Sequence, residues 1–152
     1  MAFYDLPKPE RDKLVEKINS DILAGIQSGK REHIVSYFSD EDTYIRKTAY
    51  IAIGRIYAAN KPLQKKILSL LQHLLKEDDY RIRQTVINAA GEIGMKDFDI
   101  IQPFMDTGLF DAHHAIRNAV IGSMKKMGEK NPVPVLKWSE KYLHHEDKEI
   151  RR

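Results

Sequence analysis

The 152-residue sequence predicts an all-α protein, a right-handed α-α superhelix of about three and a half helical hairpins with an N-terminal capping helix. Three observations predict this class: a motif that recurs four times, an apolar stripe of helical spacing in each copy, and a second amphipathic segment between copies. In such an array each hairpin covers the apolar face of the hairpin before it. We therefore expect one continuous stack of helices.

Residues 1–29 are expected to form the N-terminal cap, with a helix over residues 8–29. The apolar positions of this helix recur at helical spacing at Leu14, Ile18, Ile22 and Ile26. Gly29 stands where the helix would end. A terminal element of an array needs one solvated face, which is why we assign this helix to the cap. Residues 31–38 predict the short first helix of repeat one.

An Ile-Arg pair marks one helix of each repeat. Copies align as YIRKTAYIAIGRIY (44–57), RIRQTVINAAGEIG (81–94) and AIRNAVIGSMKKMG (115–128), and EIRR (149–152) opens a fourth. Successive pairs are 37, 34 and 34 residues apart, a period typical of solenoids. The predicted buried stripes are Ile45, Ala49, Ala52, Ile53 and Ile56, then Ile82, Val86, Ala89, Ala90 and Ile93, then Ile116, Val120, Ser123, Met124 and Met127. Gly94 and Gly128 are expected to end their helices in the left-handed conformation.

Second amphipathic segments lie between these helices, at residues 62–75, 97–110 and 131–145. Pro62 suits the first turn of a helix, and Pro103 is expected to shorten or bend its helix. The predicted repeats are 30–60, 61–95 and 96–129, with a truncated repeat at 130–152. Because residue 152 falls two positions after the fourth isoleucine, we expect a fragment of a longer array, in one domain. Its last helix would expose Val135, Trp138 or Tyr142.

An acidic residue stands six positions before the arginine in three copies: Asp40 with Arg46, Glu77 with Arg83, and Asp111 with Arg117. A small residue follows the arginine in the pattern, and a glycine stands near the end of the helix. Together these features resemble the HEAT-like α-solenoid, related to armadillo-type arrays, over residues 30–152. The tetratricopeptide and ankyrin signatures, which the period alone would allow, are absent. The resemblance implies a ladder in which the acid of one repeat contacts the arginine of an adjacent one. We predict that Arg46, Arg83, Arg117 and Arg151 are ladder residues, with direct phosphate binding as the alternative. The fourth copy has His145 in the acidic place.

The concave surface of a solenoid usually carries its binding residues. The outward positions predicted there are Lys47, Tyr50, Ile51, Arg55, Gln84, Ile87, Asn88, Asn118, Ile121, Lys125 and Lys126, with Glu92 beside them. This mixture of amide, aromatic, aliphatic and basic groups suits a protein or peptide partner. A nucleic-acid groove would be expected to carry more arginine and lysine, and the net charge is only +3.

No catalytic constellation is evident in the sequence. It lacks cysteine, nucleotide-binding glycine loops and a nucleophile elbow, and the pairs His113-His114 and His144-His145 have no metal-binding spacing. We therefore expect no metal and no cofactor, and leave enzymatic activity undecided. No segment approaches the roughly 18 apolar residues of a membrane span, so we expect a cytoplasmic protein without membrane contact.

Residues 124–138 and 144–152 are also similar to the HEAT-like DNA alkylation repair proteins, the AlkC/AlkD group. The matching residues are Asn131, Pro132, Val135, Leu136, Arg151 and Arg152. This resemblance implies an alternative function, DNA binding with excision of alkylated purines. The family's aromatic and acidic catalytic set is not recognisable here. Trp138, the single tryptophan, lies on an outer helix, where packing is favoured over contact with a lesion.

Overall fold

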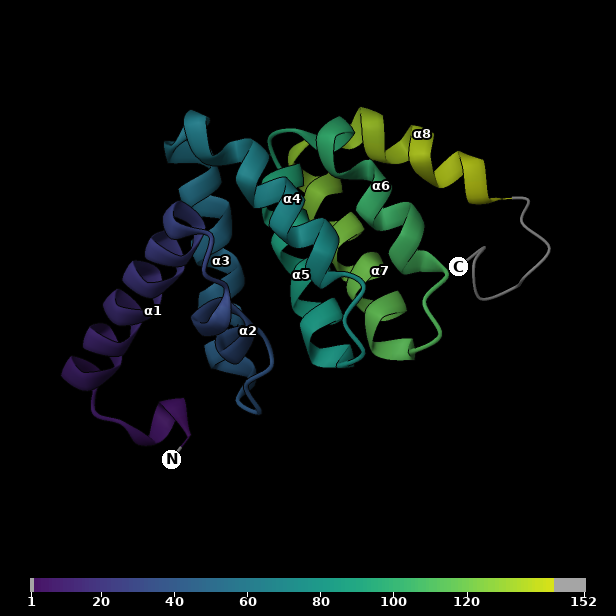
Figure 1. Cartoon of the computed structure of the whole chain (residues 1–152). Helices are drawn as coiled ribbons and strands as arrows, with labels where there is room; N and C mark the ends of the chain where they lie inside the picture. Colours follow the sequence, from purple (N-terminus) through teal and green to yellow (C-terminus); the bar gives the residue numbers. More distant parts are fainter. Residues whose placement is uncertain (1, 144–152) are drawn as a thin grey trace.

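The computed structural model describes residues 2–143, which form helices joined by short turns (Figure 1). This part of the chain contains no strand, which confirms the predicted all-α solenoid. The elements are η1 Phe3–Asp5, α1 Lys8–Ser28, α2 Glu32–Phe38, α3 Thr43–Ala59, η2 Lys61–Leu63, α4 Gln64–Leu74, α5 Tyr80–Gly94, α6 Phe98–Leu109, α7 His114–Lys130 and α8 Pro132–Leu143. The predictions made for His144, His145, Ile150, Arg151, Arg152 and the side chain of Tyr142 lie outside the described residues.

The helices stack in two layers. One row consists of α1, α3, α5 and α7, each in contact with the next (Figure 1). The other helices pack onto this row: α4 and α6 contact α5, and α8 contacts α7. The helices α3, α5 and α7 carry the Ile-Arg motif, so the α3–α5 and α5–α7 junctions each join two copies of it.

The predicted stripes form the core. Every stripe residue of α5 and α7 is buried, and so are those of α3 apart from Ile45, which is half-buried. The small residues allow close approach: a Cβ atom at Gly91 would lie 2.9 Å from the Cβ of Ser123 on α7. Alternation of small and large apolar residues thus sets how closely the helices of the row pack.

The three repeated helices begin with equivalent side-chain caps. The Asp42 carboxylate accepts from the N–H of Tyr44 at 2.9 Å, and the Asp79 carboxylate accepts from the N–H of Arg81 at 2.9 Å. In the third repeat, Nδ1 of His113 accepts from the N–H of Ala115 at 3.0 Å. Each cap satisfies one of the backbone donors that a helix leaves free at its first turn.

Two glycine predictions were wrong and one is confirmed. Gly29 ends α1 with a φ of 79°. Gly94 is the last residue of α5 and Gly128 lies inside α7, and neither has a positive φ. Gly94 instead makes room for its neighbours, because a Cβ there would collide with Sδ of Met127 and approach Cγ1 of Ile101 to 2.7 Å.

The outer helices also depart from the sequence predictions in detail. Pro103 lies inside α6 without ending it, and Pro62 belongs to η2 rather than to α4. The predicted exposure of Val135 and Trp138 was wrong, since both are 8% exposed, whereas Val133 and Leu136 are 61% exposed. The helix α8 therefore turns Val135 and Trp138 inward, and Nε1 of Trp138 donates to the Asp106 carboxylate at 2.7 Å.

Candidate functional site

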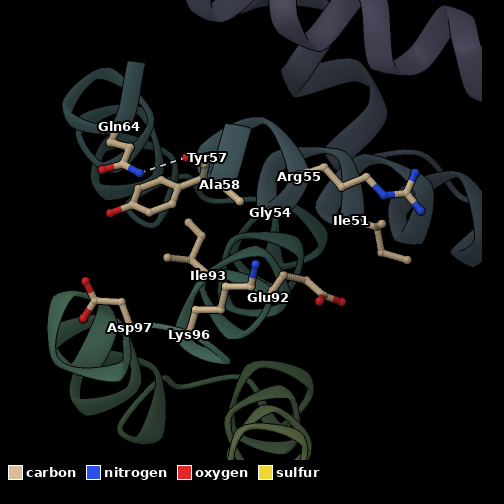
Figure 2. Close-up of a pocket in the computed structure, with 10 residues that line it drawn as sticks. All are labelled: Ile51, Gly54, Arg55, Tyr57, Ala58, Gln64, Glu92, Ile93, Lys96 and Asp97. Atoms are coloured by element: carbon tan, nitrogen blue, oxygen red, sulfur yellow. Dashed lines mark hydrogen bonds between the residues drawn. The ribbon is translucent and has the colours of Figure 1, made fainter. Parts of the chain in front are cut away.

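A groove with a volume of about 460 Å³ opens between the C-terminal halves of α3 and α5 (Figure 2). We name it the α3–α5 groove. Its lining residues are Ile51, Gly54, Arg55, Tyr57, Ala58, Gln64, Glu92, Ile93, Lys96 and Asp97. Ile51 and Arg55 were predicted on the binding surface from the sequence, and the groove adds residues from the following helix and turns.

The two helices approach each other closely at Gly54. A Cβ atom at this position would lie 2.7 Å from the Cβ of Glu92, so glycine is the residue that lets α3 and α5 meet here. Ile51 and Ile93 contribute apolar surface on either side of this contact (Figure 2). The groove therefore combines apolar surface with polar and charged side chains.

The two ends of the groove carry different chemistry. Arg55, Ile51 and Glu92 lie at one end, and Gln64, Tyr57 and Asp97 lie at the other (Figure 2). Within residues 2–143 no hydrogen bond or ion pair holds the Arg55 guanidinium or the Lys96 ammonium. These two cations are consequently available to a bound group.

Tyr57 is held in place at the end of the groove that also contains Gln64 and Asp97. Nε2 of Gln64 donates to the backbone carbonyl of Tyr57 at 2.9 Å, which ties the start of α4 to the end of α3. Burial raises the pKa of the Tyr57 hydroxyl, and the negative charge of Asp97 raises it further. The hydroxyl is therefore a neutral hydrogen-bonding group at physiological pH.

An ion pair continues the surface from the groove to α7. Nζ of Lys126 lies 2.7 Å from the Glu92 carboxylate, and the Glu92 side chain is only 11% exposed. Tyr50 lies close to this pair: burial raises its pKa, while the charge of Lys126 lowers it and that of Glu92 raises it. Because Lys126 pairs with the Glu92 carboxylate, this carboxylate is less available to a ligand than the sequence suggests.

The predicted binding residues spread over the whole row of helices. Lys47, Arg55, Asn118, Lys125 and Lys126 are exposed, and Tyr50, Ile51, Gln84, Asn88 and Ile121 are half-buried. Ile87 was assigned wrongly, because it is fully buried and its Cδ1 would lie 2.9 Å from a Cβ at Gly108 of α6. Its helical register alone placed it outward, but α6 covers that side of α5.

The motif arginines clamp the turn before their own helix. Nη1 of Arg83 donates to the carbonyl of Glu77 at 2.8 Å, and Nη1 of Arg117 donates to the carbonyl of Asp111 at 2.8 Å. Arg46 donates to the carbonyl of Asp40 in the same way. The arginine thus bonds to the backbone carbonyl of the acidic residue six positions before it. The sequence pattern instead suggested a contact with the acidic side chain.

One acidic side chain also bonds to the arginine of the preceding repeat. Nε and Nη2 of Arg83 donate to the two carboxylate oxygens of Asp111 at 2.9 and 3.2 Å. Burial acts to raise the pKa of Asp111, but the hydrogen bonds from Arg83 and from the N–H of His113 outweigh it and leave the pKa lowered. At the preceding junction Glu77 lies 3.9 Å from Arg31 instead.

Sequence reasoning missed most of the groove. Gln64, Lys96 and Asp97 lie at helix ends and in turns, where helical periodicity assigns no face. Tyr57 occupies the position of Gly94 and Gly128 in the alignment of copies, and this substitution of an aromatic residue for glycine was the available signal. Repeat alignment finds positions that are alike, whereas the groove depends on a position that differs.

The described residues hold no grouping of three or more metal-binding side chains. Likewise, no helix among them is long and apolar enough to span a membrane. Trp138 packs against the core and bonds to Asp106, as described above, so its ring is not presented on the row of α3, α5 and α7.

The family model described as non-SMC mitotic condensation complex subunit 1 (Cnd1) matches residues 30–150. The chain belongs to the Cnd1 family. The match includes α2 to α8 and covers all three complete copies of the motif. Together with the helical stack, it supports the HEAT-like repeat architecture predicted from the sequence. Comparisons with curated proteins and with solved structures gave no match.

Proposed function

We propose that this chain is a non-catalytic HEAT-like scaffold that binds a segment of a protein partner in the α3–α5 groove. Membership of the Cnd1 family supports this proposal, because the family's description is that of a subunit of a complex. The proposal treats residues 1–152 as one repeat domain, with residues 1–29 as its cap. The row of α3, α5 and α7 provides the binding face.

The observation that carries the proposal is the pairing of apolar and unpaired polar groups in one channel. Ile51 and Ile93 supply apolar surface, while Arg55 and Lys96 are cations that form no ion pair or side-chain hydrogen bond within residues 2–143. A peptide can bury an apolar side chain and place an acidic or carbonyl group beside each cation. The face extends beyond the groove through the remaining predicted residues Lys47, Tyr50, Gln84, Asn88, Asn118, Ile121, Lys125 and Lys126.

Selection from a random peptide library on the immobilised chain tests the groove. Selected peptides are then titrated calorimetrically against the wild type, against Ala58→Trp, which fills the groove, and against Arg55→Glu. The control is Lys137→Glu, an exposed change on α8 that lies outside both the groove and the proposed binding face. We expect both groove variants to weaken binding at least about tenfold, since hot-spot losses concentrate in such pockets. Equal affinity in Ala58→Trp and wild type would refute the groove as the site.

DNA binding is the second candidate. It is supported by the similarity of residues 124–138 and 144–152 to the alkylation repair proteins and by the +4 charge of residues 114–152. Binding of a labelled duplex at about 50 mM salt tests it, because electrostatic DNA binding should be strong there and fall steeply as salt rises. Undetectable binding would exclude this candidate. If a duplex binds, the combined change of Lys47, Lys125 and Lys126 to Ala should weaken it.

A further inference from the structure

A second hollow lies away from the α3–α5 groove, between the C-terminal end of α1 and the outer helix α4. Its volume is about 580 Å³. Gly29 lies at its edge, where a Cβ atom would meet nothing within 4 Å, so the hollow is open to its surroundings at the end of α1. No part of the proposed function uses this hollow.

The floor of the hollow is apolar. Ile26 of α1 is 4% exposed, and Leu70 of α4 is half-buried and packs against the core. Both line the hollow, together with the backbone around Gly25. A ligand that rests here therefore meets aliphatic carbon rather than polar groups, and burying an apolar side chain against it is favourable.

The rim of the hollow is cationic. Lys65, Lys66, Arg31 and His73 line it, and no acidic residue is among its lining residues. Nζ of Lys66 reaches the carbonyl of Gln27 at 3.5 Å, which places the ammonium group over the end of α1. Arg31 keeps a long contact of 3.9 Å with Glu77 and is about half exposed. Among the described residues, the one ion pair of the rim is thus this long Arg31–Glu77 contact, and most of the positive charge of the rim stays uncompensated.

His73 adds a polar atom to the rim. Its Nδ1 lies 2.7 Å from the carbonyl of Ser69, and since a carbonyl accepts, Nδ1 is the donor. Nε2 is then the ring nitrogen left for a ligand. The side chain is exposed, so this nitrogen can be reached from solvent.

We propose that this hollow binds an acidic, apolar segment of a partner protein. An aliphatic side chain of the segment rests on Ile26 and Leu70, and flanking carboxylates pair with Lys65, Lys66 and Arg31. Charge complementarity of this kind selects an acidic partner and speeds association. Duplex or single-stranded nucleic acid fits less well, because no Phe, Tyr or Trp lines the hollow to stack on bases and a phosphate backbone leaves the apolar floor uncovered.

A designed peptide tests the proposal. The probe is a fluorescein-labelled peptide of about a dozen residues in which leucine pairs alternate with glutamate pairs, titrated into the full chain by fluorescence anisotropy. The double variant Lys65→Glu, Lys66→Glu should weaken binding at least about tenfold, since it reverses the charge beside the ligand. The matched control is Lys13→Glu, Lys137→Glu, which makes the same charge change at exposed positions on α1 and α8 that line neither the hollow nor the α3–α5 groove. It should change affinity by less than about twofold.

A second variant tests the space in the hollow independently of the charge on its rim. Ser69→Trp fills the space and leaves the charge unchanged, so it should also weaken binding at least about tenfold. Ser69 is exposed, and circular dichroism melting checks that each variant is folded. A peptide with glutamine in place of glutamate should bind weakly.

Four results would overturn the proposal: absence of binding, equal binding of the glutamine peptide, equal losses in the control variant, or unchanged binding in Ser69→Trp. A duplex that binds in a Lys65- and Lys66-dependent manner while the peptide does not would assign the hollow to nucleic acid instead. Because neither lysine lines the α3–α5 groove, these results leave the proposed function untouched.

Discussion

The junction between α5 and α7 is filled at Gly94, whereas the junction between α3 and α5 opens into a groove near Tyr57, the equivalent residue of the first repeat. At Gly94 the side chains of Met127 and Ile101 fill the space that a Cβ would need. The equivalent residue of the first repeat is Tyr57, whose ring forms one wall of the groove (Figure 2). A difference in side-chain size at one repeat position thus accompanies the change from a filled junction to an open one.

The two junctions also differ in their ion pairs. Arg83 of α5 holds Asp111 through two hydrogen bonds, with side chains only 17% and 13% exposed. Arg46 of α3 instead bonds to the Asp40 carbonyl and to Oγ1 of Thr43, while Glu77 approaches Arg31. A partly buried pair contributes more to stability than a long exposed one. We therefore expect the α5–α7 junction to be the more sensitive to substitution.

Ala89→Leu should produce the largest loss in the middle of the row. Ala89 is fully buried in α5, which contacts both α3 and α7. Added methyl groups force neighbouring helices apart, and we expect a loss of about 1–3 kcal/mol in the free energy of unfolding. Urea denaturation measures it. A loss no larger than that of an exposed loop substitution would mean that the stripe of α5 is misassigned.

Asp111→Asn should destabilise the same junction in a pH-dependent way. We expect a loss of about 1–2 kcal/mol at pH 7, because Arg83 loses its charged partner. Since folding lowers the pKa of Asp111, its stabilisation is complete above the unfolded value of about 3.9 and disappears as pH falls through the folded value. Urea denaturation from about pH 7 to pH 2 should therefore show wild type and variant converging in acid. A constant difference at every pH would contradict the pairing.

Gly91→Ala and Gly122→Ala should change stability in opposite directions. At Gly91 the new Cβ meets Oγ and Cβ of Ser123 at 2.8 and 2.9 Å, so we expect a loss of about 1 kcal/mol. At Gly122 it meets nothing within 4 Å, so higher helix propensity should give a gain of about 0.5–1 kcal/mol. Paired thermal melts measure both, and shifts of the same sign would argue against close packing at the α5–α7 contact.

Lys96→Ala should have the smallest effect on stability. Its side chain is exposed in the turn after α5, and we expect a change below about 0.5 kcal/mol in urea denaturation. Affinity for a peptide selected on the α3–α5 groove should nevertheless fall, because Lys96 lines it. A variant that unfolds readily would show that this lysine holds the junction together rather than facing a ligand.

Periodicity predicted most of the fold because the same physical demand recurs in each copy. A helix in a stack must bury one stripe, and spacing alone located Val86, Ala90 and Val120 in it. Spacing failed where a second layer covers the other side of a helix, as α6 does at Ile87. The expected exposure of Val135 and Trp138 was wrong for another reason: it assumed that a missing helix left this face of α8 uncovered, whereas both side chains are buried.

The groove was predicted only in part, because it depends on features that periodicity does not encode. Ile51 and Arg55 were found since they lie on an outward helical face. Lys96 and Asp97 were missed because turn geometry places them, and Tyr57 was missed because it belongs neither to the predicted buried stripe nor to the predicted outward positions. The role of Arg83 toward the Glu77 backbone was likewise invisible, since it involves a carbonyl rather than a side chain.

A pair of double-mutant cycles tests most directly whether the repeats stack in one register. The same cycles test whether side chains are coupled more strongly across α5–α7 than across α3–α5. Arg83→Met and Asp111→Asn, singly and together, give the coupling free energy across α5–α7, and Arg46→Met with Glu77→Gln gives it for the preceding junction. We expect a coupling free energy of at least about 1 kcal/mol for the first cycle and below about 0.3 kcal/mol for the second. Negligible coupling between Arg83 and Asp111, or equal coupling in the two cycles, would contradict it.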